Sequence, residues 1–246
     1  AVGTRVVALK GATGMVLAYM MQEGNAGFAI ELYDAPDQLT GKFISGEVDI
    51  AAVPINLAST LYNKTEGKAV MLCVNTLGVL YVLENGSAVQ SMADLSGKTI
   101  YATGQGSTPE YILNYLLEKN GITDPAVEYV GEHAALASML AAGEADIGML
   151  PEPNVSSVLL KSDTARIALD MTEEWNKVSD TQLLQGCYIA NRDFYEAHPA
   201  AVQQFLKDYA ASVAFANNSV AETAALLEKH GIFKAAVAEK AIPYCN

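Results

Sequence analysis

Two short segments of the chain combine glycines with hydroxyl side chains, which suits them to hold a small polar group. Gly11-Ala12-Thr13-Gly14 follows one apolar run, and Gly104-Gln105-Gly106-Ser107-Thr108 follows another. Glycine lets a backbone approach a ligand closely, and a hydroxyl both donates and accepts hydrogen bonds. If each segment opens a helix, its unpaired backbone N–H groups attract an anion. The two segments therefore predict noncovalent binding of a small polar or anionic molecule.

Helix capping is the competing explanation for the hydroxyls of the second segment. Thr108-Pro109-Glu110 has the pattern of an N-cap followed by proline at the first helical position. The glycines nearby and the equivalent segment around Thr13 favour ligand contact instead.

Further polar residues follow two other predicted strands, at Pro54-Ile55-Asn56 and at Pro151-Glu152-Pro153-Asn154. In open parallel sheets, ligands bind beyond the carboxyl ends of the strands. Capping of the next helix explains each asparagine equally well. The predicted ligand-binding residues are Gly11, Thr13, Gly14, Pro54, Asn56, Gly104, Ser107, Thr108, Glu152 and Asn154.

Lys10, His133 and Trp175 form a second group of candidate ligand contacts, and each has a structural alternative. Lys10 follows the first strand and is either a cation at the site or a solvated loop residue. His133 is either a contact or the first residue of a helix. Trp175, beside the second crossover between the predicted lobes, either stacks on a planar ligand or packs against the hinge.

The chain contains no recognisable catalytic motif. Gly-x-Ser-x-Gly, the nucleotide P-loop and HExxH are all absent, and Gly104–Pro109 is not a complete GxGxxG. We therefore expect no catalytic residues and no cofactor.

The three cysteines, Cys73, Cys187 and Cys245, form no CxxC pattern, and no Cys/His cluster has metal-ligand spacing. We expect Cys73 and Cys187 to be buried, unpaired thiols, Cys245 to be a free thiol near the end of the sequence, and no metal. The formal net charge of −13 disfavours nucleic acid and anionic membranes as partners. With 51% hydrophobic and 17% charged residues, the composition is that of a soluble globular protein without a membrane span.

A repeated phrase indicates how the candidate residues are positioned. Gly46-Glu47-Val48-Asp49-Ile50 recurs as Gly143-Glu144-Ala145-Asp146-Ile147, and Pro54 and Pro151 follow at the same offset. Hydrophobic periodicity predicts a β-α-β-α-β order around each copy. The first copy has strands at 4–9, 28–33 and 49–53 with helices at 15–23 and 37–45. The second has strands at 98–102, 127–130 and 146–150 with helices at 108–120 and 133–142. This alternation predicts an α/β fold of two lobes, each a mostly parallel sheet flanked by helices.

The remaining segments predict an insertion. Residues 69–84 read as two strands around Asn75-Thr76, residues 183–190 as another strand, and residues 194–216 and 219–229 as long helices. Residues 194–229 contain no predicted strand, so these helices must pack against a sheet formed by other parts of the chain. We therefore expect lobe two, residues 86–180, to be inserted into lobe one, residues 1–85 plus 181–246. Two crossovers between the lobes would permit hinge closure.

Three stretches resemble the ABC-transporter substrate-binding lipoproteins that bind nitrate, sulfonates, taurine or thiamine precursors. They are Leu9–Met15, the run from Gly46 to Ala58, and Gly106-Ser107-Thr108-Pro109-Glu110-Tyr111. The resemblance covers nearly the whole chain and implies the type II periplasmic-binding-protein fold. It also implies a monomeric receptor that delivers a small solute to a membrane permease, outside the cytoplasm and lipid-anchored in its full-length form. Members often continue beyond the position of Asn246.

Two alternatives remain open at the level of sequence. Enzymes of menaquinone and thiamine-pyrimidine synthesis share this architecture by resemblance, and only Lys10 and His133 offer themselves as reactive residues. A ligand-sensing domain is the other alternative.

Overall fold

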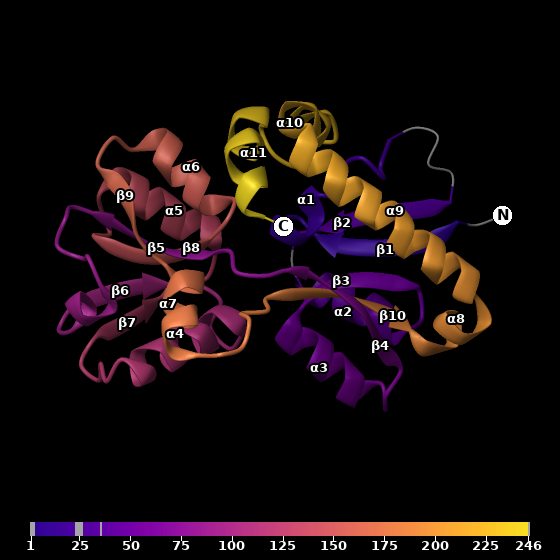
Figure 1. Ribbon diagram of the computed structural model, residues 1–246, viewed down its shortest axis with the longest axis horizontal. Coiled ribbons are helices and arrows are strands. Elements are labelled where there is room, and N and C mark those ends of the chain that lie inside the picture. Colours follow the sequence, from indigo (N-terminus) through magenta and orange to yellow (C-terminus); the bar gives the residue numbers. More distant parts are fainter. Residues whose placement is uncertain (1–2, 23–26, 35, 246) are drawn as a thin grey trace. The chain divides into compact units, whose positions relative to one another are not determined.

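The computed structural model describes residues 3–22, 27–34 and 36–245, and it divides into two compact units. Unit 1 comprises Ala1–Leu77 and Leu184–Asn246, and unit 2 comprises Gly78–Leu183. Figure 1 labels the elements of both. The chain thus leaves unit 1 once and returns to it once, so that unit 2 is an insertion.

Unit 1 contains a five-stranded sheet in the order β2 (Phe28–Tyr33), β1 (Thr4–Leu9), β3 (Ile50–Pro54), β10 (Gly186–Asn191) and β4 (Ala69–Thr76). Strand β1 is parallel to β2 and β3, whereas β10 is antiparallel to β3 and β4. The helices are α1 (Ala12–Met15), α2 (Pro36–Ile44), α3 (Ile55–Lys64), α8 (Arg192–Ala197), α9 (Pro199–Asn218), α10 (Val220–Lys229), α11 (Ala235–Ala241) and the 3-10 helix η2 (Ile242–Tyr244).

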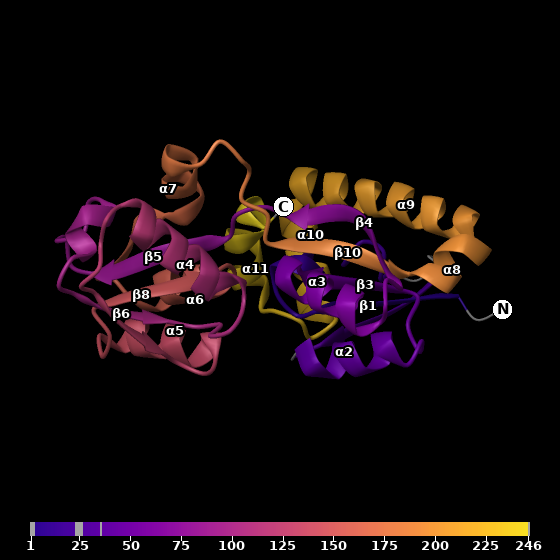
Figure 2. The same cartoon turned by 90° about the horizontal axis from the view of Figure 1, so that it is seen from below.

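Helices cover both faces of the unit 1 sheet, with α2 on one face and α9 on the other (Figure 2). Leu39 and Phe43 of α2 and Leu61 of α3 pack against the apolar residues of β1, β3 and β10. On the opposite face, Tyr188 of β10 contacts two aromatic rings of α9. Strands that are apolar on both sides are expected for a sheet covered in this way.

Unit 2 repeats the arrangement with β7 (Ala126–Tyr129), β6 (Thr99–Ala102), β8 (Ile147–Pro151), β5 (Leu80–Asn85) and β9 (Ala165–Asp170). Strand β5 is antiparallel to its neighbours β8 and β9, and it occupies the same place in this sheet as β10 does in unit 1. Pro54 pairs with Gly186 in unit 1, and Pro151 pairs with Leu80 in unit 2. The helices are η1 (Met92–Leu95), α4 (Thr108–Lys119), α5 (His133–Ala142), α6 (Asn154–Lys161) and α7 (Met171–Val178). The predicted fold class, two α/β sheets flanked by helices, is confirmed.

The first predicted helix is much shorter than expected. The pattern predicted residues 15–23, but α1 spans Ala12–Met15, and Glu23 lies outside the described residues. Beyond α1, turn-like bonds such as Leu17 N to Gly14 O alternate with helical ones. Met15 and Leu17 are fully buried, as are most of their neighbours. A segment buried on all sides lacks the polar face of an amphipathic helix, so tertiary packing determines its path.

The helix predicted over 194–216 is divided in two. Helix α8 ends at Ala197 and α9 begins at Pro199, with His198 between them in a non-helical conformation. Proline lacks an N–H and disfavours helical geometry in the residue before it, which explains the break.

The domain boundaries also differ from those expected. Strand β5, which we assigned to lobe one, pairs with β8 and β9 in the sheet of unit 2. The break between β4 and β5 falls at Leu77–Val79 rather than at Asn75-Thr76. Residues 80–83 are apolar without alternation, so the sequence pattern alone does not indicate which sheet this strand joins.

Candidate functional site

The carboxyl ends of β1, β3 and β4 and the start of β10 lie at one edge of the unit 1 sheet, which we call edge 1. The equivalent edge 2 of unit 2 contains the ends of β6, β8 and β9 and the start of β5. All the predicted contacts except Trp175 follow strands that end at one of these edges. Each edge is described by itself.

Thr13 and the glycines beside it form the first part of edge 1. The Thr13 hydroxyl lies 3.5 Å from the Leu9 carbonyl oxygen, at the long limit of a hydrogen bond. A Cβ atom at Gly14 would lie 2.4 Å from the same oxygen, so this position requires glycine. The four-residue α1 does not supply the helix N-terminus that the sequence predicted here. Any ligand contact in this segment therefore depends on the hydroxyl and the local backbone.

Lys10 is paired with a carboxylate. Its Nζ lies 3.0 Å from Oδ1 of Asp34, and the Asp34 side chain is largely exposed. The negative charge of Asp34 therefore offsets the positive charge of Lys10, which was the one cation predicted for this site.

Pro54 and Asn56 occupy the end of β3 and the first turn of α3, where Ile55 N donates to Gln185 O at 3.1 Å. The pairing of Pro54 with Gly186 brings the start of β10 to the same place. A Cβ atom at Gly186 would lie 3.1 Å from the Thr13 methyl group. Edge 1 therefore brings together Thr13, Pro54 and the start of β10.

Sequence reasoning missed two buried polar residues at the end of β4. Asn75 is 9% exposed and Thr76 is 2% exposed, and their side-chain polar atoms have no hydrogen-bond partner among the described residues. The nearby Tyr188 hydroxyl is also unpartnered. Burial raises the pKa of Tyr188 well above its ordinary value, with repulsion from Tyr209 adding to the effect. The feature of the sequence that could have identified these two residues is a polar Asn-Thr pair at the end of an otherwise apolar strand.

At edge 2, Gly104 and Ser107 define the loop that precedes α4. Ser107, rather than Thr108, is the N-cap residue, and its hydroxyl donates to the Gly104 carbonyl at 2.7 Å. Gly104 has a φ of 73°, and a Cβ there would lie 2.8 Å from the Ser107 Oγ. The loop thus has a left-handed turn that only glycine adopts readily.

Glu110 contacts this loop. Its carboxylate accepts a hydrogen bond from Gly106 N in the turn that leads into α4. An acidic group at a helix N-terminus is stabilised there, so Glu110 fills the place that an anionic ligand would take.

His133 begins α5 and faces the end of β6. Its Nδ1 lies 2.6 Å from the hydroxyl of Thr103, which is fully buried. His133 is exposed as a whole, but partial desolvation of its ring by the surrounding protein lowers its pKa, which favours the neutral imidazole. Because one ring nitrogen is held by Thr103, the other is oriented and remains for a further partner.

Glu152 and Asn154 follow β8. The Glu152 carboxylate, 4% exposed, accepts bonds from Ser156 N at 3.1 Å and from Ser156 Oγ at 2.9 Å. Both carboxylate oxygens therefore stabilise the first turn of α6, of which Asn154 is the first residue.

Trp175 packs within unit 2. Its ring centroid lies 4.7 Å from that of Tyr115 in α4, and its Nε1 donates to Thr181 O at 2.7 Å. These contacts account for its position by packing.

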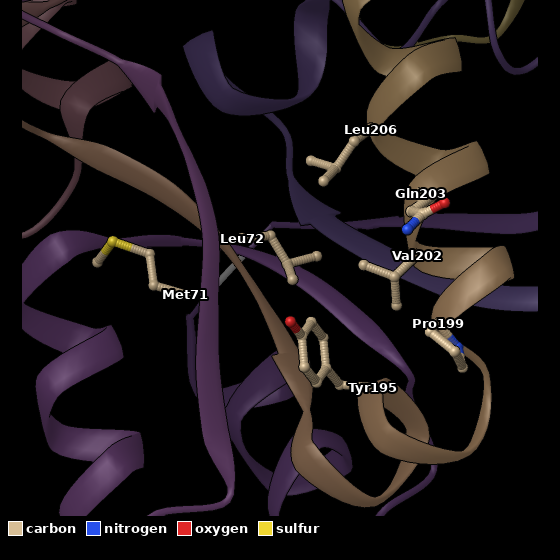
Figure 3. A pocket seen from close by; sticks show the side chains of 7 residues that line it. All are labelled: Met71, Leu72, Tyr195, Pro199, Val202, Gln203 and Leu206. Atoms are coloured by element: carbon tan, nitrogen blue, oxygen red, sulfur yellow. The ribbon is translucent and has the colours of Figure 1, made fainter.

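A shallow apolar pocket on unit 1 lies away from edge 1, between β4 and helices α8 and α9 (Figure 3). It is lined by Met71, Leu72, Tyr195, Pro199, Val202, Gln203 and Leu206. None of the predicted site residues lines it.

Within the described part of the chain, no group of His, Cys, Asp and Glu side chains is arranged to hold a metal ion. Among the same residues, no helix has the length and apolar composition that crossing a membrane requires. None of the three cysteines forms a disulfide. Cys187 is buried as expected, whereas Cys73 is only partly buried. Cys245 is buried near the end of the sequence, with its Sγ 3.6 Å from Sδ of Met15.

Comparison with known protein families identifies the family of this chain. The model of the NMT1/THI5-like family matches residues 63–222. The chain belongs to the NMT1/THI5-like family. A search of curated proteins gives no match.

Solved structures agree with this NMT1/THI5-like assignment. An ABC transporter protein from Parabacteroides distasonis is 25% identical with a TM-score of 0.85, and the match covers 100% of this chain and 85% of that one. The periplasmic aliphatic sulphonate-binding protein SsuA from Escherichia coli is 21% identical with a TM-score of 0.77, covering 99% and 84%. The periplasmic nitrate-binding protein NrtA from Synechocystis is 13% identical with a TM-score of 0.67, covering 93% and 66%. The family resemblance and the type II periplasmic-binding fold are thereby confirmed.

Proposed function

We propose that this chain is the solute receptor of an ABC importer and that it binds a small polar or anionic organic molecule with groups from both units. The family assignment and the similarity to periplasmic proteins that bind aliphatic sulphonates and nitrate support this proposal. The observation that carries it is the repeated architecture. Two sheets of the same topology each place glycine, hydroxyl and polar side chains at the strand ends where ligands of α/β sheets bind.

The charges near the two edges indicate the class of solute. All three arginines of the chain are engaged elsewhere. Arg5 pairs with Asp49, Arg166 with Glu84, and Arg192 donates to the Gly67 carbonyl. Lys10 is compensated by Asp34. A polyphosphate needs several cationic partners, so the proposed ligand is small and carries little charge.

The groups proposed to hold this ligand are the Thr13 hydroxyl at edge 1 and Ser107, Thr108 and His133 at edge 2. Backbone groups around Gly11, Gly14 and Gly104 complete the set, and Asn56, Glu152 and Asn154 set the orientation. Lys10 and Trp175 remain secondary candidates because both already have protein partners.

Closure of the two units over the solute is part of the proposal. The two chain crossings, between residues 77 and 78 and between 183 and 184, are where a hinge would bend. A ligand shifts such an equilibrium only by binding the closed state more tightly, which requires contacts to both units. The proposed partner is the membrane permease. The proposed location is extracytoplasmic, with a lipid anchor on the full-length protein and a monomeric receptor domain.

An enzyme on the same fold is the alternative. Its candidate reactive residues are His133, whose partner is the Thr103 hydroxyl, and Lys10, whose partner is a carboxylate. The Thr103 hydroxyl lies next to a base but is fully buried, which keeps it from a substrate, and the Lys10 amine is held in an ion pair. Both features favour the receptor. Conversion of a bound solute during incubation would support the enzyme instead.

Isothermal titration on matched variants tests the proposal. The ligand is the solute that native mass spectrometry detects on freshly purified protein. Thr13→Ala and Ser107→Ala remove hydroxyls from the two edges. Thr60→Ala and Ser138→Ala remove exposed hydroxyls that bond to helix carbonyls in the same units. A lost hydrogen bond to a charged group costs about 1.5–3 kcal/mol, or roughly tenfold or more in affinity. Unchanged affinity in both edge variants would refute the assignment.

A further inference from the structure

Asn75 lies in a β-bulge at the carboxyl end of β4. Gly186 of β10 pairs with Thr76 and Cys187 pairs with Val74, so the ladder passes over Asn75. A bulge redirects the side chain of the extra residue, and bulges are common beside binding sites. The bulge therefore aims the Asn75 side chain at a position that regular pairing would not reach.

The Asn75 side chain is buried without a partner. Neither Nδ2 nor Oδ1 forms a hydrogen bond with any described residue, although Asn75 is only 9% exposed. The Thr76 hydroxyl beside it is also unpartnered and almost fully buried. Burying an unsatisfied amide opposes folding, and most buried polar groups do find a partner. Among the described residues, the Tyr188 hydroxyl is near enough to interact with the amide but makes no hydrogen bond of regular geometry with it. The hydrogen-bonding capacity of the amide is therefore not filled by the chain.

Gly186 leaves room for the Asn75 side chain, because it has no Cβ atom of its own. A Cβ atom at Gly186 would lie 2.7 Å from Oδ1 of Asn75 and 3.1 Å from the Thr13 methyl group. Both side chains therefore converge on the glycine, and Asn75 lies beside the Thr13 segment of edge 1.

The repeat in unit 2 shows that the fold does not require this cluster. Leu80, buried and apolar, occupies the place of Gly186. The neighbouring strand β9 ends in Asp170, whose carboxylate caps α7 by accepting from Thr172 N at 2.9 Å. At the same position in the unit 2 sheet, an apolar side chain thus fills the space, and the neighbouring carboxylate has a hydrogen-bond partner within the chain.

We propose that Asn75 recognises the ligand of the proposed function through a group that both donates and accepts hydrogen bonds. The inference rests on that function. The amide offers a donor at Nδ2 and an acceptor at Oδ1. A carboxamide or sulfonamide satisfies both, whereas a carboxylate or sulfonate leaves Oδ1 unpaired. Both amide atoms are covered in this structure, so contact follows rotation of Asn75 or displacement of Thr13. An internal bond to the Tyr188 hydroxyl is the competing role.

Thermal unfolding separates recognition from the competing role. Asn75→Ala removes two unsatisfied buried atoms, so the free protein should keep or raise its Tm. Asn120→Ala is the control, because the Asn120 amide donates to Leu116 O at 2.7 Å and its loss should lower the Tm. A lower Tm in Asn75→Ala would assign Asn75 to the structure of unit 1 and overturn the inference.

Titration with two pairs of probes then tests recognition. The pairs are propionamide with propionate and ethanesulfonamide with ethanesulfonate, each nearly matched in shape. The wild-type protein should bind the amide of each pair about tenfold more tightly, and Asn75→Ala should abolish that preference. Gly186→Ala, whose Cβ displaces the Asn75 amide, should have the same effect.

The outcomes distinguish this inference from the proposed function. Wild-type protein that prefers the anions, or an amide preference unchanged in Asn75→Ala, would overturn the inference and leave the receptor function standing. Wild-type protein that binds none of the four probes and carries no solute after purification contradicts both.

Discussion

The Thr103 hydroxyl lies 2.6 Å from Nδ1 of His133, and this contact links the end of β6 to the first residue of α5. Thr103 is fully buried, so the imidazole is anchored to the core of unit 2 while its other nitrogen remains available. The pair places an oriented, neutral histidine at edge 2, where a ligand would meet it.

The lowered pKa of His133 predicts a loss of stability in acid. Partial desolvation of the ring holds the folded-state pKa below the ordinary value of 6.5, so the unfolded chain binds this proton first as the pH falls. The stabilisation is complete above pH 6.5 and decreases below it. Chemical denaturation of wild type and His133→Gln across this range should show the wild-type advantage shrinking in acid. An advantage that is constant, or that grows in acid, contradicts the assignment.

Asp49 should be more important for stability than ordinary surface carboxylates. It accepts hydrogen bonds from Arg5 N, Nε and Nη2 at 2.8, 3.1 and 2.6 Å, and its side chain is only 11% exposed. Asp49→Ala should cost about 2–3 kcal/mol in urea denaturation. Lys68→Ala breaks the exposed pair with Asp193 and should cost less than about 1 kcal/mol. Equal costs would show that the Arg5 pair has no special role.

Gly78 lies against the start of α7. A Cβ atom there would lie 1.5 Å from the Thr172 Oγ1. Gly78→Ala should therefore displace α7 and destabilise unit 2 by about 1–3 kcal/mol. Gly41→Ala is the matched control, since nothing lies within 4 Å of a Cβ there and the residue is inside α2. That change should stabilise unit 1 by about 0.5–1 kcal/mol. The prediction fails if thermal unfolding shows the two variants equally stable.

The repeat made much of the fold predictable from the sequence. Constant offsets between Gly46 and Gly143 and between Pro54 and Pro151 predicted equivalent strands, and the structure pairs both prolines with the first residue of the antiparallel strand. Tyr33 and Tyr129 end the equivalent strands β2 and β7. Local patterns are sufficient here because the central strands β3 and β8 are short apolar runs, buried along most of their length and ended by proline.

Other features depend on tertiary contacts that a pattern does not reveal. The short α1 results from burial on every side, and the membership of β5 results from pairing with β8 and β9. Pro199 itself indicates a helix break in the sequence, but the hydrophobic periodicity of residues 194–216 predicted one continuous helix. Asn75 was not predicted as a site residue, because two features that only the structure shows distinguish it. These are the register shift between β4 and β10 and the lack of hydrogen bonds to its buried amide.

Hydrogen exchange with mass spectrometry tests the central claim, that one solute contacts both units. The solute released from freshly purified protein is added back at saturation, and exchange is compared with that of the stripped protein. We expect slower exchange at Gly11–Met15 in unit 1 and at Gly104–Glu110 in unit 2 in the same sample. Protection confined to one unit, or to neither, would contradict the proposed receptor.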